Sequence, residues 1–308
     1  METFKPVAPE FLIPELVRNT DTLYRIDGGA ERFYYRLNPT GGIDFYGSIT
    51  SLKKQVTPMA KPIIDKMIEL GKDFDAYRNN KAHFGTFWHI QAAELTINRS
   101  YDFKQLDVRI ASYAASHADC GDTSWWFETA WKGLLSWAQC MQDFDIQPEA
   151  VEIPLWHPDG YAGTTDLVCT KWEDKYTDKT PDNKRIRVRA IIDWKTGGIY
   201  DDHAIQLELN KKTWDFHFPH MPISQLFNWS PTDWRKTPGY EFKNQTGKES
   251  DNIDLLVALW KVKGVKKPYD KRQLLIDLLT LDTDLSTAWK HRTIEEILLE
   301  KHARKDAP

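Results

Sequence analysis

The chain has 308 residues, 41% of them apolar, which is enough to bury one large core or two smaller ones. Its formal net charge of −4 excludes an overall basic field of the kind that attracts nucleic acid, although a local groove can still be basic. No run approaches about 18 consecutive apolar residues, so we expect no membrane-spanning helix.

The cysteines and the first residues of the chain indicate the cellular compartment of the protein. Cys120, Cys140 and Cys169 are far apart and form no CxxC pair, which predicts free thiols rather than a disulfide framework or a zinc knuckle. Met1–Pro6 has no basic segment followed by an apolar run, so we expect no secretory signal. Together these features predict a cytoplasmic protein with no membrane partner.

The N-terminal part of the chain is rich in residues that interrupt regular structure. Frequent Pro and Gly predict an irregular segment over residues 1–45. Within it, residues 24–26 and 32–37 are predicted to form short strands around a turn at Asp27–Gly29.

Helical patterns follow. Apolar spacing predicts a helix over residues 62–70, and two more are predicted over 103–118 and 124–144. Between them, Thr86 is predicted to cap the start of a helix, which would place His89 in its first turn.

Strand patterns dominate after residue 148, and the best of them covers residues 187–195. A helix is predicted over 201–217, residues 172–186 are predicted to form a polar excursion, and residues 251–308 are predicted to be mostly helical. Strands are predicted over residues 151–155, 162–170, 187–195, 223–229 and 240–243. The order helix, strand, strand, strand, helix predicts an α/β domain with helical additions.

The end of the strand at 187–195 carries two charged residues. Side chains two apart in a strand share a face, so Asp193 and Lys195 project together while Ile192 and Trp194 point the other way. A carboxylate and an ammonium ending an apolar strand are costly unless they are paired or bind a ligand. Taken alone, the pattern is more typical of a surface ion pair.

A second carboxylate precedes this strand. Asp166 lies among small and apolar residues, and an antiparallel pairing of the two strands would place it opposite Asp193. Facing carboxylates repel each other unless a cation lies between them. Mg²⁺, which binds carboxylate, water and phosphate oxygens, would resolve that repulsion.

These residues belong to an ordered set of motifs. The pieces, in chain order, are Tyr46–Leu52, Gly85–His89 with Glu94, Glu152, Gly163–Asp166, Asp193–Gly197 and Gln206. The set resembles the PD-(D/E)XK nuclease superfamily, and within it the RecB-like and phage-type exonucleases. The resemblance implies a restriction-endonuclease-like core, with a central mixed β-sheet flanked by helices, over residues 46–250.

The resemblance also implies roles for individual residues. It implies a metal site formed by His89, Asp166, Asp193 and the backbone carbonyl of Trp194, holding one or two Mg²⁺ or Mn²⁺ ions. It further implies that Lys195 holds the attacking water and that Gln206 orients it, with Glu152 as an additional site carboxylate. For His89 a packed helical histidine is the alternative, and for Glu152 a solvent-facing side chain.

The chain departs from the family pattern at two points. Asn210 stands where the family has Tyr, which leaves the role of that helix position open. The cysteines that bind an iron–sulfur cluster in CRISPR-associated relatives are missing, so no such cluster is expected.

Basic residues around these motifs are candidates for holding phosphates. Those closest in sequence are Arg187, Arg189, Lys211 and Lys212, together with Lys184 and Arg185, and a solvated surface is the alternative. The resemblance implies a DNA nuclease, an exonuclease of phage-type recombination or repair, whose partner would be a single-strand annealing protein or a helicase. A nuclease acting on RNA and a DNA-binding protein with a vestigial site are the competing hypotheses.

Overall fold

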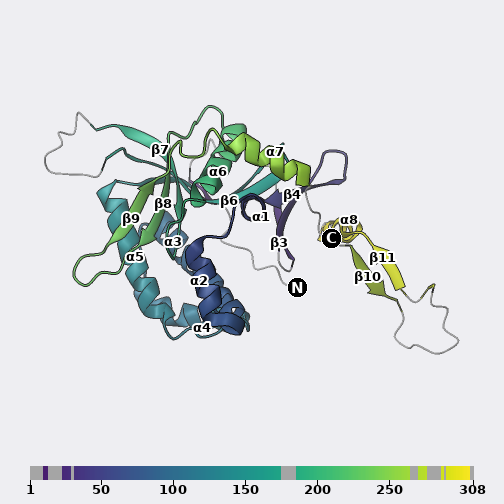
Figure 1. Ribbon diagram of the computed structural model, residues 1–308, viewed down its shortest axis with the longest axis horizontal. Helices are drawn as coiled ribbons and strands as arrows, with labels where there is room; N and C mark the ends of the chain where they lie inside the picture. The colour runs from purple at the N-terminus through teal and green to yellow at the C-terminus, as the bar shows by residue number, and fades with distance from the viewer. Residues whose placement is uncertain are drawn as a thin grey trace.

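The computed structural model describes residues 10–12, 23–28, 31–174, 185–263, 270–275, 286–287 and 289–305. Over these residues the protein is an α/β fold in which helices flank a central mixed β-sheet (Figure 1). The described part contains no helix that is both long and apolar enough to cross a membrane.

The strands fall into two sheets. The main sheet has the order β2-β3-β4-β6-β7-β8-β9, with β5 paired to β6 and β1 paired to β5, and a separate hairpin joins β10 to β11. The bounds are β1 Glu10–Phe11, β2 Tyr24–Gly28, β3 Glu31–Leu37, β4 Ile43–Ser48, β5 Gln147–His157, β6 Tyr161–Trp172, β7 Arg187–Trp194, β8 Gln225–Pro231, β9 Tyr240–Asn244, β10 Lys271–Leu274 and β11 Trp289–Arg292.

The α-helices are α1 Ile49–Val56, α2 Lys61–Leu70, α3 Phe74–Asn98, α4 Leu106–Ser116, α5 Trp126–Asp143, α6 His203–His217, α7 Ile253–Lys263 and α8 Ile294–Lys305. Helices α2, α4, α5 and α6 lie close to predicted ranges. The predicted order of a helix, three strands and a helix is confirmed as α5, β5, β6, β7 and α6.

Two helical layers cover the sheet. Helices α3 and α5 pack on one face, where Trp88, Leu134 and Trp137 meet Ile192 and Trp194 in a shared core. Helix α6 covers the other face, where Leu207 and Trp214 pack with residues of β5 to β8. Figure 1 shows α3 and α5 on one side of the strands and α6 and α7 on the other. The alternation of β7 explains this arrangement, because successive strand residues face opposite layers.

The register of the central strands positions the carboxylates. β6 and β7 are antiparallel with Leu167 opposite Ile192, so continuing this register places Asp166 beside Asp193. β7 and β8 are parallel, with Asp193 opposite Asn228. The expected antiparallel pairing of the two carboxylate-bearing strands is therefore confirmed.

The start of α3 differs from the prediction. The helix begins at Phe74, so Thr86 is an interior residue whose Oγ1 donates to the carbonyl of Ala82, 3.1 Å away, and does not cap the helix. His89 accordingly lies well inside the helix and not in its first turn. Gly85 destabilises the interior of this helix by about 1 kcal/mol relative to alanine. The burial of Phe84, Phe87 and Trp88 outweighs that cost.

The described part of residues 1–45 is not irregular. β2, β3 and β4 form an antiparallel meander that extends the main sheet, and β4 pairs in parallel with β6. Aromatic residues of β3 explain why the meander forms, since Tyr34 and Tyr35 are both buried on opposite faces in separate clusters. The rest of this segment, including Gly29 of the predicted turn, lies outside the described residues.

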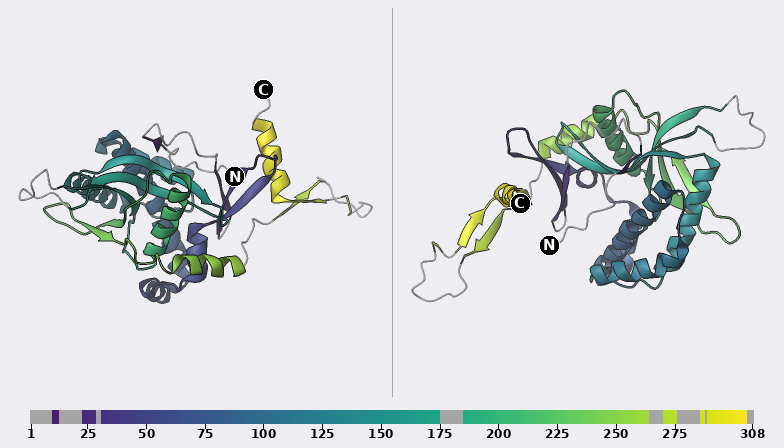
Figure 2. Two further views of the ribbon diagram at one scale, coloured as in Figure 1. Left: turned by 90° about the horizontal axis from the view of Figure 1, so that it is seen from above. Right: turned by 180° about the vertical axis from the view of Figure 1, so that it is seen from behind.

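The C-terminal part contains a hairpin in addition to its helices. α8 packs on the meander through Leu298, which contacts a cluster with Tyr35 and Ile43. The β10–β11 hairpin extends beyond α8, away from α3 and α5 (Figures 1 and 2). The predicted polar excursion over 172–186 falls largely on residues 175–184, which lie outside the described residues.

Candidate active site

A pocket of about 370 Å³ opens beside the first half of β6 and the end of β7, between α3, α6 and the β2–β3 pair. Its lining includes all the residues that the sequence assigned to the metal and to the chemistry: His89, Glu152, Asp166, Asp193, Trp194, Lys195 and Gln206. These residues come from five different elements or their ends, so only the folded chain brings them together.

Three of these side chains offer ligand atoms close to one another. The Nδ1 atom of His89 lies 3.3 Å from Oε1 of Glu152 and 3.6 Å from Oδ1 of Asp166. Among the described residues, this is the group whose imidazole and carboxylate atoms all lie within 4.8 Å of one another. Such a set of one nitrogen and two oxygens suits a divalent cation.

The electrostatics of this group favour a cation. Burial, with the neighbouring carboxylates Asp193 and Glu152, raises the pKa of Asp166 to about 7, against the opposing effect of His89. Burial by itself would lower the pKa of His89, but Asp166 and Glu152 outweigh that effect and raise it to about 9. Without a metal ion, the excess negative charge of the site therefore retains protons, which a divalent ion would replace.

Glu152 reaches the site through an unusual backbone conformation. Its φ is +50°, the left-handed region that L-residues seldom adopt. Val151 and Ile153 flank it yet belong to cores on opposite faces of the sheet, so the side chains of this strand do not alternate regularly. The left-handed residue interrupts the alternation and turns the Glu152 carboxylate toward His89. Backbone strain of this kind often marks a functional position.

Protein donors hold one oxygen of Asp166 and both oxygens of Asp193. Oδ2 of Asp166 accepts a hydrogen bond from the backbone N–H of Trp194 at 2.7 Å, which leaves Oδ1 toward His89. Asp193 lies outside the group of three because its carboxylate has other partners. Trp194 lines the pocket as well, and a role for its carbonyl stays a prediction.

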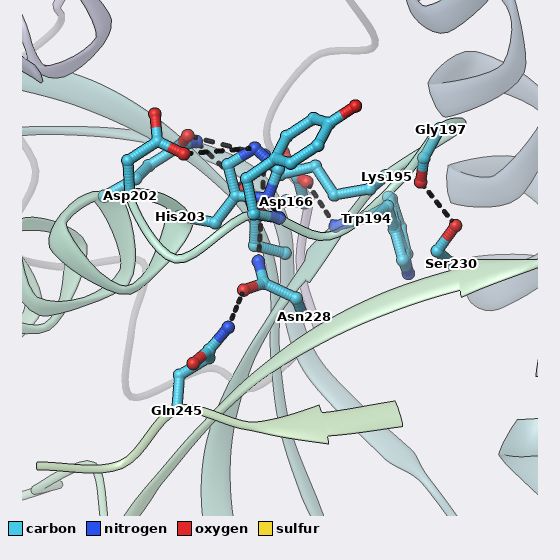
Figure 3. A network of polar contacts seen from close by, with 12 residues as sticks. Asp166, Trp194, Lys195, Gly197, Asp202, His203, Asn228, Ser230 and Gln245 are labelled. Atoms are coloured by element: carbon cyan, nitrogen blue, oxygen red, sulfur yellow. Dashed lines mark hydrogen bonds and ion pairs between the residues drawn. The ribbon is translucent and has the colours of Figure 1, made fainter. Parts of the chain in front are cut away.

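Asp193 is surrounded by donors. Nζ of Lys195 lies 2.6 Å from its Oδ2, so the two side chains share a side of the strand end as expected. Gln206 Nε2 donates to Oδ1 at 2.9 Å, and Gln206 Oε1 in turn lies 3.4 Å from the Lys195 ammonium. Asn228, which sequence reasoning missed, donates from Nδ2 to Oδ2 at 2.6 Å (Figure 3).

Two further motif positions have structural explanations. Asn210, at the position where Tyr was expected, is buried beside the pocket, and its Oδ1 would lie 3.1 Å from a Cβ added at Gly163. Ile49 approaches the same point to 2.6 Å, so Gly163 allows α1 and α6 to lie close to β6. Glu94 lies away from the site and forms an ion pair with Arg109.

The predicted phosphate-binding residues do not line the pocket. Each has an acidic partner elsewhere: Arg187 pairs with Asp145, Arg189 with Glu149, Lys211 with Asp215 and Lys212 with Asp254. Arg187 and Arg189 lie toward the start of β7, whereas the pocket lies at its end. Because a strand is extended and rises about 3.3 Å per residue, residues a few positions apart along it are well separated in space. Lys184 lies outside the described residues.

Other basic residues take their place. Arg25, Arg32 and Lys81 line the pocket. In the β2–β3 register Arg25 is opposite Tyr34, and Arg32 is opposite Asp27, so Arg25, Arg32 and Tyr34 share a face. Lys81 precedes His89 by two helical turns on α3, with Gly85 between them. The predicted helix start at Thr86 concealed this relation.

A scan against models of known protein families finds no match for the chain. A search among curated proteins likewise finds no match.

Proposed function

We propose that the protein is a divalent-metal-dependent nuclease that hydrolyses phosphodiester bonds of DNA, with a restriction-endonuclease-like core of the PD-(D/E)XK type. One observation carries this proposal: two facing carboxylates, a lysine, a histidine and a glutamate converge in one pocket from separate elements. The ordered motif set supports the same conclusion from the sequence.

The donor set fits the proposed metal. His89, Glu152, Asp166 and Asp193 would hold the ion. Carboxylate oxygens suit Mg²⁺. Because the site also offers an imidazole nitrogen, Mn²⁺ should bind at least as well as Mg²⁺. When bound, the metal would polarise a phosphoryl oxygen and make a water molecule more acidic.

The side chains around the metal have separate tasks in this proposal. Lys195 would position the attacking water and stabilise the negative charge that develops on the phosphate. Gln206 contacts both Lys195 and Asp193, so it would fix the lysine relative to the carboxylate. Because both contacts already exist, the protein would not need to reorganise them during the reaction.

Substrate phosphates would contact the basic wall of the pocket. Lys81 and His89 are eight residues apart on α3, which corresponds to about 12 Å along the helix. Lys81 would therefore hold a phosphate other than the scissile one. Arg25 and Arg32 supply further positive charge on the facing wall. Such contacts position a strand without reading its sequence.

The test is a cleavage assay with end-labelled linear and circular DNA, single- and double-stranded, with Mg²⁺ or Mn²⁺ and with EDTA. We expect metal-dependent cleavage, and a loss on the order of a thousandfold or more for Asp193→Asn, which keeps the shape but removes the charge. Circular dichroism would show that the variant is folded. No cleavage of any substrate by the wild type would contradict the proposal.

Including RNA in the same panel tests the alternative substrate. A DNA-binding protein with a vestigial site would bind the substrates and cleave none. The convergence of Asp166, Asp193 and Lys195 favours an enzyme, because DNA binding alone does not require buried carboxylates.

A further inference from the structure

Asp193 is linked to a chain of buried amides that crosses two neighbouring strands. Asn228 of β8 donates from Nδ2 to Oδ2 of Asp193 at 2.6 Å. Gln245, just after β9, donates from Nε2 to Oδ1 of Asn228 at 2.9 Å. Figure 3 shows Asn228 lying between Gln245 and the residues around Lys195. Asn228 and Gln245 are both fully buried.

The backbone fixes this chain of contacts. The parallel register of β7 and β8 sets Asp193 beside Asn228. The backbone N–H of Gln245 donates to the carbonyl of Leu226 at 2.8 Å, which anchors Gln245 against β8. The three side chains therefore meet because of strand pairing and not because of a mobile loop.

The second amide is costly if its role is only to fill space. Oε1 of Gln245 is buried and has no hydrogen-bond partner among the described residues. An unsatisfied buried carbonyl oxygen costs about 1–3 kcal/mol, and an apolar side chain of similar volume would avoid that cost. The hydrogen bond to Asn228 gives this amide a function. With Gln245 donating to Oδ1 of Asn228, the Asn228 amide must present its N–H to the carboxylate.

We propose that Asn228 and Gln245 are positioning residues that orient Asp193 for metal binding. Lys195 and Asn228 together occupy Oδ2, whereas Oδ1 has Gln206 as its one described side-chain donor. Asn228 and Gln245, which we call the relay, thus anchor Oδ2 of Asp193 and leave a lone pair of its Oδ1 for the ion. The relay does so with neutral groups, whereas another cation beside Lys195 would oppose metal binding. This inference rests on the proposed function.

Gln245→Met tests the relay at the position farthest from the metal. Methionine has a similar volume but cannot donate to Asn228, so the Asn228 amide loses its fixed orientation. We expect the Kd for Mn²⁺ to rise about tenfold, the lower end of the effect of removing groups that orient metal ligands. Tryptophan fluorescence can follow the titration, because the Trp194 ring lies 5.7 Å from the His89 ring.

Thr246→Val is the matched control. Oγ1 of Thr246 accepts a hydrogen bond from the backbone N–H of Leu226, so the variant removes a hydrogen bond next to Gln245 but none of the side-chain hydrogen bonds between Gln245, Asn228 and Asp193. We expect its Kd for Mn²⁺ to equal that of the wild type. If Gln245→Met fails to fold, Asn228→Ala should raise the Kd at least as much.

A double-mutant cycle without metal separates the relay from the proposed function. We expect the effects of Gln245→Met and Asp193→Asn on the unfolding equilibrium constant to be coupled by at least threefold, whereas Thr246→Val and Asp193→Asn should be additive. Additivity for Gln245 would overturn the relay. Failure of the wild type to bind Mn²⁺ would instead contradict the proposed function, and the cycle would still decide the relay.

Discussion

Lys195 and Asp193 illustrate how one residue can be tested apart from its neighbours. Lys195 is not a metal ligand in the proposed site, and its charge opposes that of the ion. Lys195→Met should therefore keep or increase the affinity for Mn²⁺. The cleavage rate should fall by about a hundredfold or more, which is the usual effect of removing one donor that stabilises the charge of a transition state. Calorimetry and single-turnover cleavage measure the two effects. Loss of metal binding with activity would make Lys195 a structural partner of Asp193.

The raised pKa of His89, about 9, predicts that metal binding releases protons. At pH 7.5 the imidazole is protonated in the metal-free site, and binding requires the neutral form, so close to one proton should be released from it. The affinity for Mn²⁺ should then rise with pH up to about 9 and level off above it. Calorimetry in buffers of different ionisation enthalpy measures the release, and His89→Gln should lower it.

The left-handed backbone at Glu152 predicts a reversal of the usual preference in strands. Glycine ordinarily destabilises a strand interior by about 0.5–1 kcal/mol relative to alanine. At a φ of +50°, alanine carries a steric cost that glycine lacks. Glu152→Gly should consequently be more stable than Glu152→Ala by about 1 kcal/mol in chemical denaturation. The ordinary order, with alanine more stable, would show that the strand is regular at this position.

At the scale of an element, β6 carries a buried charge far from the pocket. Lys171 is fully buried and donates to the carbonyls of Trp172 and Glu173 at 2.9 and 3.0 Å. Its ammonium lies over the ring of Phe227, 4.4 Å from the centroid. Burial lowers the pKa of Lys171 to about 8. Nothing in the pocket contacts it, so its consequence is for stability.

The lowered pKa of Lys171 predicts a contribution of this residue to stability that increases as the pH rises above 8. Between the folded-state pKa near 8 and the ordinary value of 10.5, the unfolded chain binds more protons, so stability increases with pH. The slope should reach about 1.4 kcal/mol per pH unit at most. Urea denaturation between pH 7 and 9.5 measures it. Lys171→Met should remove this component, and an unchanged pH dependence in that variant would contradict the assignment.

At the scale of the whole molecule, the proposed function predicts that a DNA strand binds where positive charge lines the pocket. Lys81→Ala should weaken binding of single-stranded DNA in EDTA about equally for all sequences and reduce the slope against salt concentration by about one. Lys211→Ala is the matched control, because Lys211 pairs with Asp215 outside the pocket. Fluorescence anisotropy at several salt concentrations compares them. Equal effects of both variants would place the DNA elsewhere.

Local patterns in the sequence were sufficient for much of the framework. Alternation in residues 187–195 predicted β7, its apolar face with Ile192 and Trp194, and the charged pair at its end, because strand geometry has a fixed period of two. Apolar spacing likewise predicted α2, α5 and α6. Single residues in motif order, including His89, Asp166 and Gln206, identified the side chains that line the pocket.

Only the tertiary structure decided which charges share the pocket and how the carboxylates are held. Arg187 and Lys211 are near the motif in sequence yet pair with other residues, whereas Arg25 and Lys81 arrive from distant elements. The turn of Glu152 toward His89 depends on one backbone angle, and the contact of Asn228 with Asp193 depends on strand register. Sequence periodicity describes one element at a time, while these contacts depend on how separate elements pack against each other.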